Sequence, residues 1–323
     1  MAKKELSSIF DAMYHGKHDF QDFLAGDITT RYKVTTLKGM ELYKTDEKLK
    51  AYHKFLNLFV FEFLKVNENV VYSYRKGVNV ASAVQKHAGS RHFFQTDLKS
   101  FFNSIDSALV RETVKNNFDS IPVSDIDRYL DRIIEMSTVN DMLPIGFSTS
   151  PIISNACLQK FDSILEDYCI AQNLIYTRYS DDIILSSSGD TRLYGIDTTV
   201  GEMLKECFGE KLNLNFSKTK FSSVGNKIKI LGMVILPNGA VTIDSKLKNT
   251  IEVLLHFYAS DKTKFNDRLE SESSKLKGDN SVGLLQISGY LNYVNTTDPH
   301  YLNKLRKKYG TSVVDAFIRG TVK

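Results

Sequence analysis

The chain has 323 residues, of which 42% are hydrophobic and 25% charged, proportions that are ordinary for a globular protein of about two domains. No segment approaches the roughly 18 uninterrupted apolar residues of a membrane span, and the polar N-terminus lacks the apolar stretch of a signal peptide. Three widely separated cysteines, Cys157, Cys169 and Cys207, argue against a disulfide framework or a zinc site. We therefore expect a cytoplasmic protein with no membrane partner.

The net charge of +4 is distributed unevenly along the chain. Residues 1–96 contain 15 Lys or Arg and 10 Asp or Glu, which gives +5. Residues 97–240 contain 14 and 19, which gives −5, and residues 241–323 contain 13 and 9, which gives +4. An acidic centre between basic ends suits a cation site flanked by surfaces that hold a polyanion.

The hydrophobic pattern predicts the following elements in chain order: a helix at 47–66, a strand at 70–77, a strand from His92 that passes into a turn near Asn103, helices at 124–137 and 152–173, a hairpin at 174–188, a helix at 195–209, an extended stretch at 212–221, a hairpin at 227–243, and helices from 244 onward. The central order is strand, helix, two strands, helix, strand. This order is typical of a βαββαβ unit, an antiparallel sheet backed by helices.

Two adjacent carboxylates, Asp181 and Asp182, lie at the tip of the predicted hairpin YTRYSDDIILSS. Their repulsion raises a pKa unless a cation offsets it, and such oxygen ligands favour Mg²⁺. A third carboxylate, Asp97, ends the strand HFFQTD, which in a βαββαβ sheet lies beside the hairpin. Three carboxylates of this kind suit a pair of metal ions about 3.5–4 Å apart that catalyse phosphoryl transfer. The alternative is a hydrated turn, but the apolar flanks and Asp97 favour the metal site.

Four segments occur in a fixed order along the chain: DLKSFFNSI at 97–105, LPIGFSTSP at 143–151, YSDD at 179–182 and LNLNFSKTKF at 212–221. They resemble motif A, motif B, the Tyr-x-Asp-Asp box and motif D of reverse transcriptases, and ILGMVI at 230–235 lies where the primer grip of that family falls. YSYRKGVNVASAVQKH at 72–87 and GLLQISGYLNYVNTTDPHYLNKLRKKYG at 283–310 are similar to the segment before motif A and to the thumb of bacterial retron-type enzymes. The resemblance spans roughly residues 40–310.

The resemblance implies an α+β right-hand polymerase with a βαββαβ palm, α/β fingers and a helical thumb. The implied domains are fingers at 1–96 with an N-terminal helical part, palm at 97–243 with part of the fingers inserted at about 107–150, and thumb at 244–323. The implied enzyme is an RNA-directed DNA polymerase that uses two Mg²⁺ ions, or Mn²⁺, and acts in antiphage defence. The implied partners are dNTPs, a dedicated non-coding RNA as template or scaffold, the RNA–DNA hybrid and an effector protein.

The resemblance also assigns roles to single residues of the motifs. Asp97, Asp181 and Asp182 become the metal ligands, and Leu98 offers its backbone carbonyl to the second ion. Lys218 matches the motif D lysine that donates a proton to pyrophosphate; the alternative is a solvated surface lysine.

Other matches concern the substrate. Phe102 corresponds to the aromatic gate that excludes the 2′-hydroxyl of ribonucleotides, and neighbouring Phe101 is then a core residue; the alternative is that Phe102 is itself a core phenylalanine. Tyr179 is implied to pack beneath the primer terminus. The implied nucleic-acid contacts of the thumb, which are solvated lysines and arginines on the alternative reading, are Lys304, Arg306, Lys307 and Lys308.

The match departs from the family pattern at the nucleotide site. Motif B has Ile145, followed by Gly146, where the family has a glutamine that helps to frame the incoming nucleotide. The usual arginine and proline of the fingers box are replaced around MELYKT at 40–45. The candidates for holding the triphosphate are then Lys38, Lys44 and Arg75.

Two retron signatures are also altered. His87 lies at the expected place before motif A, but AVQK precedes it instead of the Asn-Ala-x-x of retron enzymes. The usual Val-Thr-Gly of the later hairpin is replaced by Ile230-Leu231-Gly232. We interpret the chain as a relative of retron enzymes of the kind used in phage defence.

Two rival functions stay open at this point. The first is template-independent or protein-primed DNA polymerisation of the abortive-infection type, which Ile145 and the altered fingers box favour. The second is a catalytically idle RNA-binding scaffold that holds an effector. The intact set of three carboxylates argues against the second, because an idle site has no reason to keep them.

Overall fold

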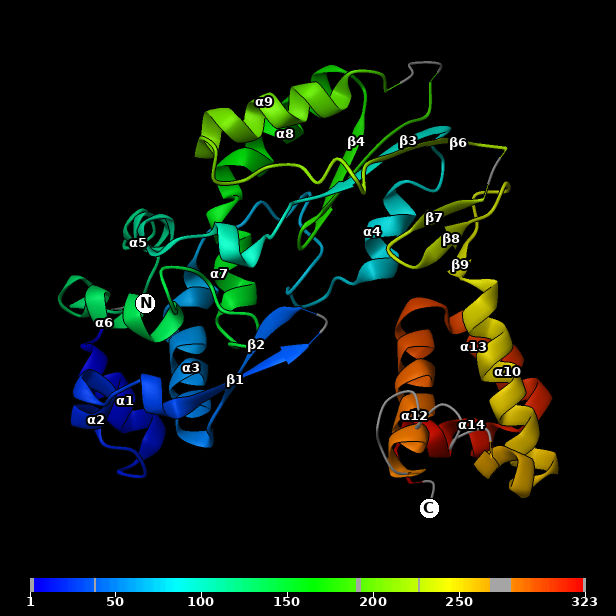
Figure 1. Cartoon of the computed structure of the whole chain (residues 1–323), viewed down its shortest axis with the longest axis horizontal. Coiled ribbons are helices and arrows are strands. Elements are labelled where there is room, and N and C mark those ends of the chain that lie inside the picture. Colours follow the sequence, from blue (N-terminus) through cyan, green and yellow to red (C-terminus); the bar gives the residue numbers. More distant parts are fainter. Residues whose placement is uncertain (1–2, 38, 190–192, 226, 268–279, 322–323) are drawn as a thin grey trace. The chain divides into compact units, whose positions relative to one another are not determined.

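The structure is a computed structural model that describes residues 3–37, 39–189, 193–225, 227–267 and 280–321 (Figure 1). The chain forms two compact units: the first is Met1–Lys76, Phe93–Ser187 and Arg192–Phe221, and the second is Gly77–His92, Ser188–Thr191 and Ser222–Lys323. The three predicted domains stay a prediction beside this division. Lys38, a predicted triphosphate contact, lies outside the described residues. Within the described ranges, no helix has the length and apolar character needed to cross a membrane.

The first unit holds most of the sheet and helix elements. Its helices and strands are α1 (Leu6–Tyr14), α2 (Phe20–Ala25), β1 (Tyr32–Leu37), β2 (Met40–Thr45), α3 (Glu47–Phe59), β3 (His92–Asp97), α5 (Ser107–Lys115), α6 (Leu130–Ser137), α7 (Ser150–Cys157), α8 (Gln159–Ala171), β4 (Ile175–Tyr179), β5 (Asp182–Ser187), α9 (Ile196–Phe208) and β6 (Lys220–Ser223). The first residue of β3 and the last two residues of β6 are assigned to the second unit. Short 3₁₀ turns, η1 to η4, lie at Thr29–Arg31, Phe61–Phe63, Phe102–Ser104 and Ile126–Tyr129.

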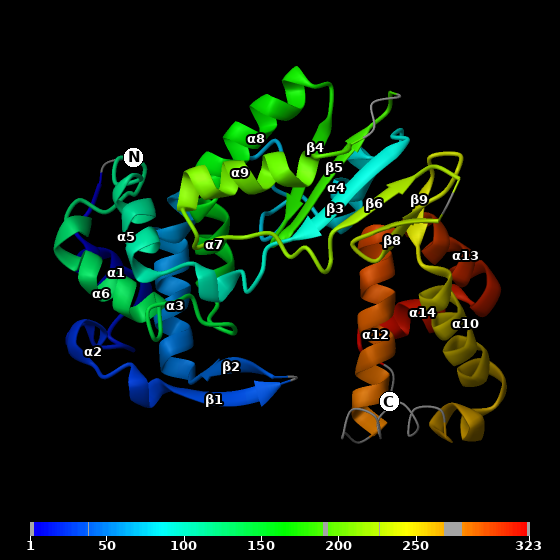
Figure 2. The same ribbon diagram turned by 45° about the horizontal axis from the view of Figure 1, so that its top comes forward.

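A four-stranded sheet of order β4-β5-β3-β6 forms the centre of this unit (Figure 2). In chain order its strands alternate with helices as β3, α7 and α8, β4, β5, α9 and β6, so the predicted βαββαβ arrangement is confirmed. The β4–β5 hairpin pairs Tyr179 with Asp182, which leaves Ser180 and Asp181 as its turn. β3 lies next to β5, and the amide of Leu98 donates to the carbonyl oxygen of Asp181 at 3.0 Å.

The inner strand β5 of this sheet is covered on both faces. Ile183, Ile184 and Leu185 are consecutive in β5 and all are buried. On α8, Phe161 and Leu165 are one helical turn apart and also buried, and the helix packs against β4 and beside α9 (Figure 1). The apolar flanks of the Asp-Asp pair therefore anchor the turn in a packed core.

The predicted strand at 70–77 is wrong. Only Val71 forms a β-bridge, a parallel one with Arg178 at the edge of β4. The ladder ends there because the backbone turns at Tyr74, which has a left-handed φ of 54°. A β-rich composition favoured a strand, but the segment meets its partner strand at a single bridge.

Two predicted helices are shorter than expected. The helix at 152–173 is two helices, α7 and α8, that meet at Leu158. The helix at 47–66 ends at Phe59 and is followed by the 3₁₀ turn at Phe61–Phe63. Apolar periodicity continues through both breaks, which is why the pattern alone does not show them.

The β1–β2 hairpin contacts the LPIG segment of motif B through the backbone. The amide of Tyr43 donates to the carbonyl of Ile145 at 2.8 Å. The next residue, Gly146, has a φ of 112°, and a Cβ atom there would lie 2.4 Å from the carbonyl oxygen of Tyr43. A glycine is required at this position both by its backbone conformation and by the close approach of β2.

The second unit combines a small sheet with helices. Its elements are α4 (Val80–Lys86), β7 (Ile228–Ile230), β8 (Met233–Ile235), β9 (Val241–Ile243), α10 (Ser245–Ser260), α12 (Asn280–Thr297), α13 (Pro299–Tyr309) and α14 (Thr311–Ile318). The predicted hairpin at 227–243 is a three-stranded sheet, β7-β8-β9. The extra turn consists of Leu231 and Gly232, whose positive φ values of 49° and 82° are typical of a tight type I′ hairpin.

The contact at Gly146 leads to a prediction about stability. We expect Gly146→Ala to lower the free energy of unfolding by about 1–3 kcal/mol, because the alanine would adopt a strained backbone and press on the Tyr43 carbonyl. Urea unfolding followed by circular dichroism measures this loss.

Gly201→Ala is the matched control. Gly201 lies inside α9, and nothing lies within 4 Å of the place that a Cβ atom would take, so alanine there should be neutral or stabilising by up to about 1 kcal/mol. Equal stability of Gly146→Ala and the unmodified protein would contradict the argument.

Candidate active site

The ends of β3 and of the β4–β5 hairpin bring three carboxylates into one neighbourhood. Asp97 is the last residue of β3, Asp181 is the second residue of the turn and Asp182 begins β5. The hydrogen bond from the Leu98 amide to the Asp181 carbonyl joins the two segments. The topology that the sequence predicts thus places all three predicted metal ligands at one edge of the sheet.

Asp97 is almost buried, with 8% of its side chain exposed, and its two oxygens differ in their surroundings. Oδ2 accepts a hydrogen bond from Lys218 Nζ at 2.6 Å. Oδ1 is buried and has no hydrogen-bond partner among the residues that the structure describes. A buried carboxylate oxygen without a partner is costly, so a cation that contacts Oδ1 would stabilise this arrangement.

Lys218 reaches Asp97 from the loop that precedes β6. The loop is fixed on the end of β3, because the amide of Asn215 donates to the Asp97 carbonyl at 2.8 Å and the amide of Lys218 donates to the Asn215 carbonyl at 2.9 Å. The Lys218 side chain is 66% exposed. Its ammonium group is therefore free to move away from Asp97 into solvent or toward a bound anion.

The carboxylates repel one another in a partly buried site. Burial, followed by the charges of Asp181 and Asp97, raises the pKa of Asp182 to about 6. Burial and the Asp97 charge also raise the pKa of Asp181. The hydrogen bond and charge of Asp97 raise the pKa of Lys218. One ammonium group does not balance three carboxylates, so a further cation would lower their repulsion.

The carboxylate oxygens are ligands that suit a hard divalent cation, but their present arrangement does not form a ready-made metal site. Among the residues that the structure describes, no three His, Cys, Asp or Glu side chains converge as ready-made metal ligands. The ammonium group of Lys218 occupies one oxygen of Asp97. Carboxylates with raised pKa values and the unpartnered Oδ1 of Asp97 are, however, the features that a divalent ion would relieve.

The residues near the carboxylates that are predicted to contact the nucleotide or the metal differ in how deeply they are buried. Phe102 lies in the 3₁₀ turn η3 and is half-buried, whereas Phe101 is buried, with ring centroids 5.3 Å apart. Tyr179 is half-buried, and burial raises its pKa. Leu98 is buried at the end of β3. Phe101 is therefore the more buried of the two rings, but Phe102 also packs partly against the core, and its role as the aromatic gate stays a prediction.

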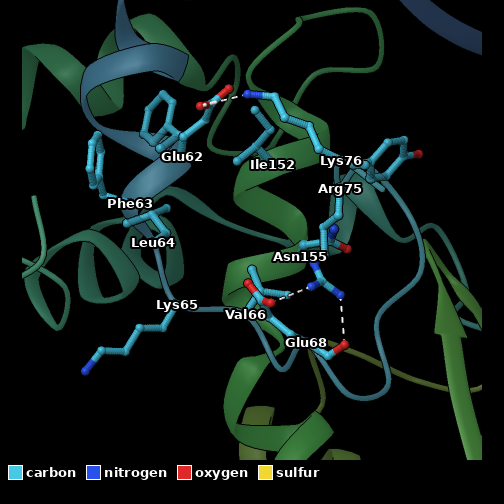
Figure 3. Close-up of a pocket in the computed structure, with 12 residues that line it drawn as sticks. Glu62, Phe63, Leu64, Lys65, Val66, Glu68, Arg75, Lys76, Ile152 and Asn155 are labelled. Carbon is cyan, nitrogen blue, oxygen red and sulfur yellow. Dashed lines mark hydrogen bonds and ion pairs between the residues drawn. The ribbon is translucent and has the colours of Figure 1, made fainter. Parts of the chain in front are cut away.

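The two described residues that were predicted to contact the triphosphate, Lys44 and Arg75, lie in different surroundings. Lys44 is exposed on β2, opposite Lys33 in the strand register. Arg75 forms an ion pair with Glu68 at 2.8 Å and donates to the carbonyls of Glu68 and Val71 at 2.9 and 2.7 Å. Figure 3 shows Arg75 turned toward Glu68 in a pocket of about 570 Å³. The arginine thus has a structural task in its own loop.

The basic residues of the thumb segment divide into two kinds within α13. Arg306 donates to Asp315 at 2.8 Å, and Lys308 forms an ion pair with Glu252 at 2.5 Å. Lys304 and Lys307 are exposed and form no ion pair with the residues described. Of the four predicted phosphate contacts, these two are the ones that need not give up an ion pair.

Sequence reasoning missed a buried polar network directly behind the turn. Arg178 and Asp162, both fully buried, form its ion pair. A signal was present: an arginine in the apolar strand IYTRY and an aspartate beside the apolar positions Phe161 and Leu165 of a helix. Each charge would be untenable alone in a core, so the two together indicate a pair.

Comparison with known proteins agrees with this geometry. The family model described as reverse transcriptase (RNA-dependent DNA polymerase) matches residues 42–235. The Retron Ec73 reverse transcriptase of Escherichia coli is 28% identical over 293 residues, 86% of either chain. The Retron Ec83 and Retron Ec86 reverse transcriptases of the same organism are each 22% identical, over 92% and 87% of this chain and 92% and 83% of their own lengths.

A solved structure of apo telomerase from Candida tropicalis is also similar, with a TM-score of 0.49 and 12% identity over 90% of this chain. This chain covers 63% of that telomerase chain. The family match covers more than half of the chain and includes the sheet and all three carboxylates. The chain therefore belongs to the reverse transcriptase family and is an RNA-directed DNA polymerase with a right-hand α+β fold.

Proposed function

We propose that the polymerase works by two-metal nucleotidyl transfer at Asp97, Asp181 and Asp182. The observation that carries the proposal is the gathering of three partly buried carboxylates, two of them with raised pKa values, around an unpartnered Asp97 Oδ1. Divalent ions, which the family uses, would activate the primer 3′-hydroxyl and stabilise the departing pyrophosphate. The three carboxylates would hold Mg²⁺ or Mn²⁺, with the carbonyl of Leu98 as a further ligand.

Three side chains of the protein have further roles in the proposed reaction. The primer 3′-hydroxyl loses its proton to water, and its oxygen forms a bond to the α-phosphorus of the dNTP as the bond to pyrophosphate breaks. Lys218 Nζ donates a proton to that pyrophosphate. Phe102 excludes the 2′-hydroxyl, and Tyr179 supports the primer terminus. Lys218 is available for this task once a cation replaces it at Asp97.

The similarity to retron reverse transcriptases supports a dedicated non-coding RNA as template or scaffold. We further propose that the product stays as an RNA–DNA hybrid against Lys304 and Lys307, that the enzyme acts in the cytoplasm, and that it serves antiphage defence together with an effector protein. Purification from the native host, followed by sequencing of the bound nucleic acid, tests the RNA partner.

Template-independent or protein-primed synthesis is the second candidate, and Ile145 in place of the family's glutamine favours it. Sequencing of products made with and without the bound RNA separates the two functions. Products that match the RNA support templated synthesis, and random or homopolymeric products made without RNA support the second candidate.

The double substitution Asp181→Asn with Asp182→Asn should abolish dNTP incorporation and leave RNA binding intact, because amides cannot replace the charge that holds the ions. Primer extension and RNA filter binding measure the two properties. Full polymerase activity in the double variant would refute the proposed site.

The same variant should be more stable than the unmodified protein in chelator, by on the order of 1–2 kcal/mol. The folded-state pKa of Asp182 is about 6, above its ordinary value of 3.8, so the folded protein binds the extra proton and loses stability as pH rises from about 4 to 6. The gain of the variant should therefore grow over this range and stay constant above it. Thermal melts across pH check this, and added Mg²⁺ should reverse the order.

Phe102→Ala should admit ribonucleotides, because the ring would no longer block the 2′-hydroxyl. The ratio of kcat/KM for dNTP to that for rNTP should fall by about tenfold or more. Phe101→Leu is the control: Phe101 is buried, so its change should lower stability without altering the ratio. An unchanged ratio in Phe102→Ala would remove that residue from the gate.

Lys218→Ala should lower kcat by about 100-fold, the usual effect of losing a general acid, while RNA affinity stays the same. Lys220→Ala, two residues further along the same loop and strand, provides a matched loss of one exposed charge. Single-turnover incorporation compares the two variants. Equal rates for both would show that Lys218 contributes only surface charge.

A further inference from the structure

Ser180, the first residue of the catalytic turn, is held through each of its polar atoms. Its amide donates to Ser73 Oγ at 2.8 Å, and its carbonyl oxygen accepts from a terminal nitrogen of Arg178 at 2.9 Å. Its hydroxyl contacts the Tyr74 hydroxyl at 3.1 Å. The backbone of Ser180 has a left-handed φ of 59°, which a residue with a side chain adopts only when its surroundings enforce it.

The guanidinium group of Arg178 is fixed by Asp162 of α8. Nε and the second terminal nitrogen donate to the two carboxylate oxygens at 2.7 and 2.6 Å, a two-pronged pairing that fixes the plane of the group. Both side chains are fully buried. The hydroxyl of Tyr176 also donates to Asp162, at 2.7 Å, and this bond goes to the carboxylate rather than to the turn.

Asn155 of α7 joins the two sides of the network. Its amide donates to the carbonyl of Ser73 at 2.8 Å, and its Oδ1 accepts from Ser73 Oγ and from Arg178, each at 3.2 Å. The backbone of Arg178 is tied to the same segment, because its amide donates to the Val70 carbonyl at 2.7 Å and its carbonyl accepts from Tyr72 at 2.9 Å. Residues far apart in sequence thus converge on one turn.

Stability alone is a poor reason for such a network. A buried ion pair contributes little over well-packed apolar residues of the same volume, because both charges lose their hydration. What the pair does here is specific: it aims one donor at the Ser180 carbonyl, immediately before Asp181. On its other side, the Asp181 carbonyl is held by the Leu98 amide next to Asp97.

We propose that Arg178, Asp162, Asn155 and Ser73 form a positioning unit that sets the place of Asp181 relative to Asp97. The inference rests on the proposed function of these two carboxylates. None of the four residues touches the substrate in this proposal; they act through the turn. A displacement of about 1 Å in a catalytic group reduces the rate by about 100-fold in other enzymes, so a turn held from three segments has a direct consequence for catalysis.

The test compares Ser73→Ala and Arg178→Lys with the unmodified polymerase. Each variant removes a donor or acceptor at Ser180, and Ser73→Ala leaves the Arg178–Asp162 pair intact in case Arg178→Lys fails to fold. Three quantities are measured well below each melting temperature: kcat and KM for dNTP on a primed RNA template, RNA affinity, and Mn²⁺ affinity without nucleotide by electron paramagnetic resonance. We expect kcat to fall about 10–100-fold and Mn²⁺ to bind several-fold more weakly, with RNA affinity unchanged.

Two control variants separate positioning from stability. Tyr176→Phe removes a hydrogen bond to Asp162 without removing a contact of Ser180, and Leu165→Ala opens a cavity on α8. Both should lower the melting temperature while kcat and Mn²⁺ affinity stay within about twofold. If Ser73→Ala keeps its kcat and Mn²⁺ affinity, or loses kcat only in step with stability as Leu165→Ala does, the inference is wrong.

The outcome also distinguishes this inference from the proposed function. The double variant of Asp181 and Asp182 serves as the reference in the same assays. Activity in that variant removes the proposed catalytic site itself. An inactive double variant, together with turn variants that behave like Leu165→Ala, leaves the site standing and removes only the positioning unit.

Discussion

Electrostatic repulsion among Asp97, Asp181 and Asp182 is the constraint on which the rest of the structure depends. The carboxylates are partly or almost wholly withdrawn from water, and burial raises the pKa of Asp182 to about 6. A flexible loop would relieve this repulsion by moving apart. The sheet prevents that, because β3 and β5 are neighbours and the Leu98 amide ties the turn to the end of β3. The fold therefore stores an unfavourable arrangement that a bound cation would relieve.

Two basic residues near the repelling carboxylates, Lys218 and Arg178, differ in exposure and mobility. Lys218 has a flexible, mostly exposed side chain and pairs with Asp97 at the open side of the site, where a cation or an anionic product can displace it. Arg178 is fully buried, always charged and fixed by Asp162, so it cannot leave. In our proposals, Lys218 adjusts the charge of the site and Arg178 fixes the place of the turn. The choice of lysine at one position and arginine at the other follows from these different tasks.

The sequence predicts where the three carboxylates lie, but it does not predict the hydrogen bonds that hold the turn in place. The order of strands and helices follows from local periodicity, and it places Asp97 beside the Asp-Asp turn without any knowledge of side-chain contacts. The hydrogen bonds of Ser73 with Ser180 and Asn155 join residues that are 107 and 82 positions apart, which periodicity does not encode. The same holds for Arg75, whose ion pair with Glu68 no pattern of spacing indicates. The predicted strand at 70–77 failed because composition does not reveal how many partners a segment meets.

The geometry of motif B limits the effects that the replacement at Ile145 can have. Ile145 replaces the family's glutamine, but the backbone at this point is held by the Tyr43 amide and by the close approach of β2 to Gly146. Neither contact involves the side chain of residue 145. The loop can therefore keep its path with either residue, and the replacement acts through the loss of one amide group and the gain of apolar surface. Any change in how the enzyme selects its template or nucleotide must then arise at that side chain, because the frame around it is set by backbone atoms.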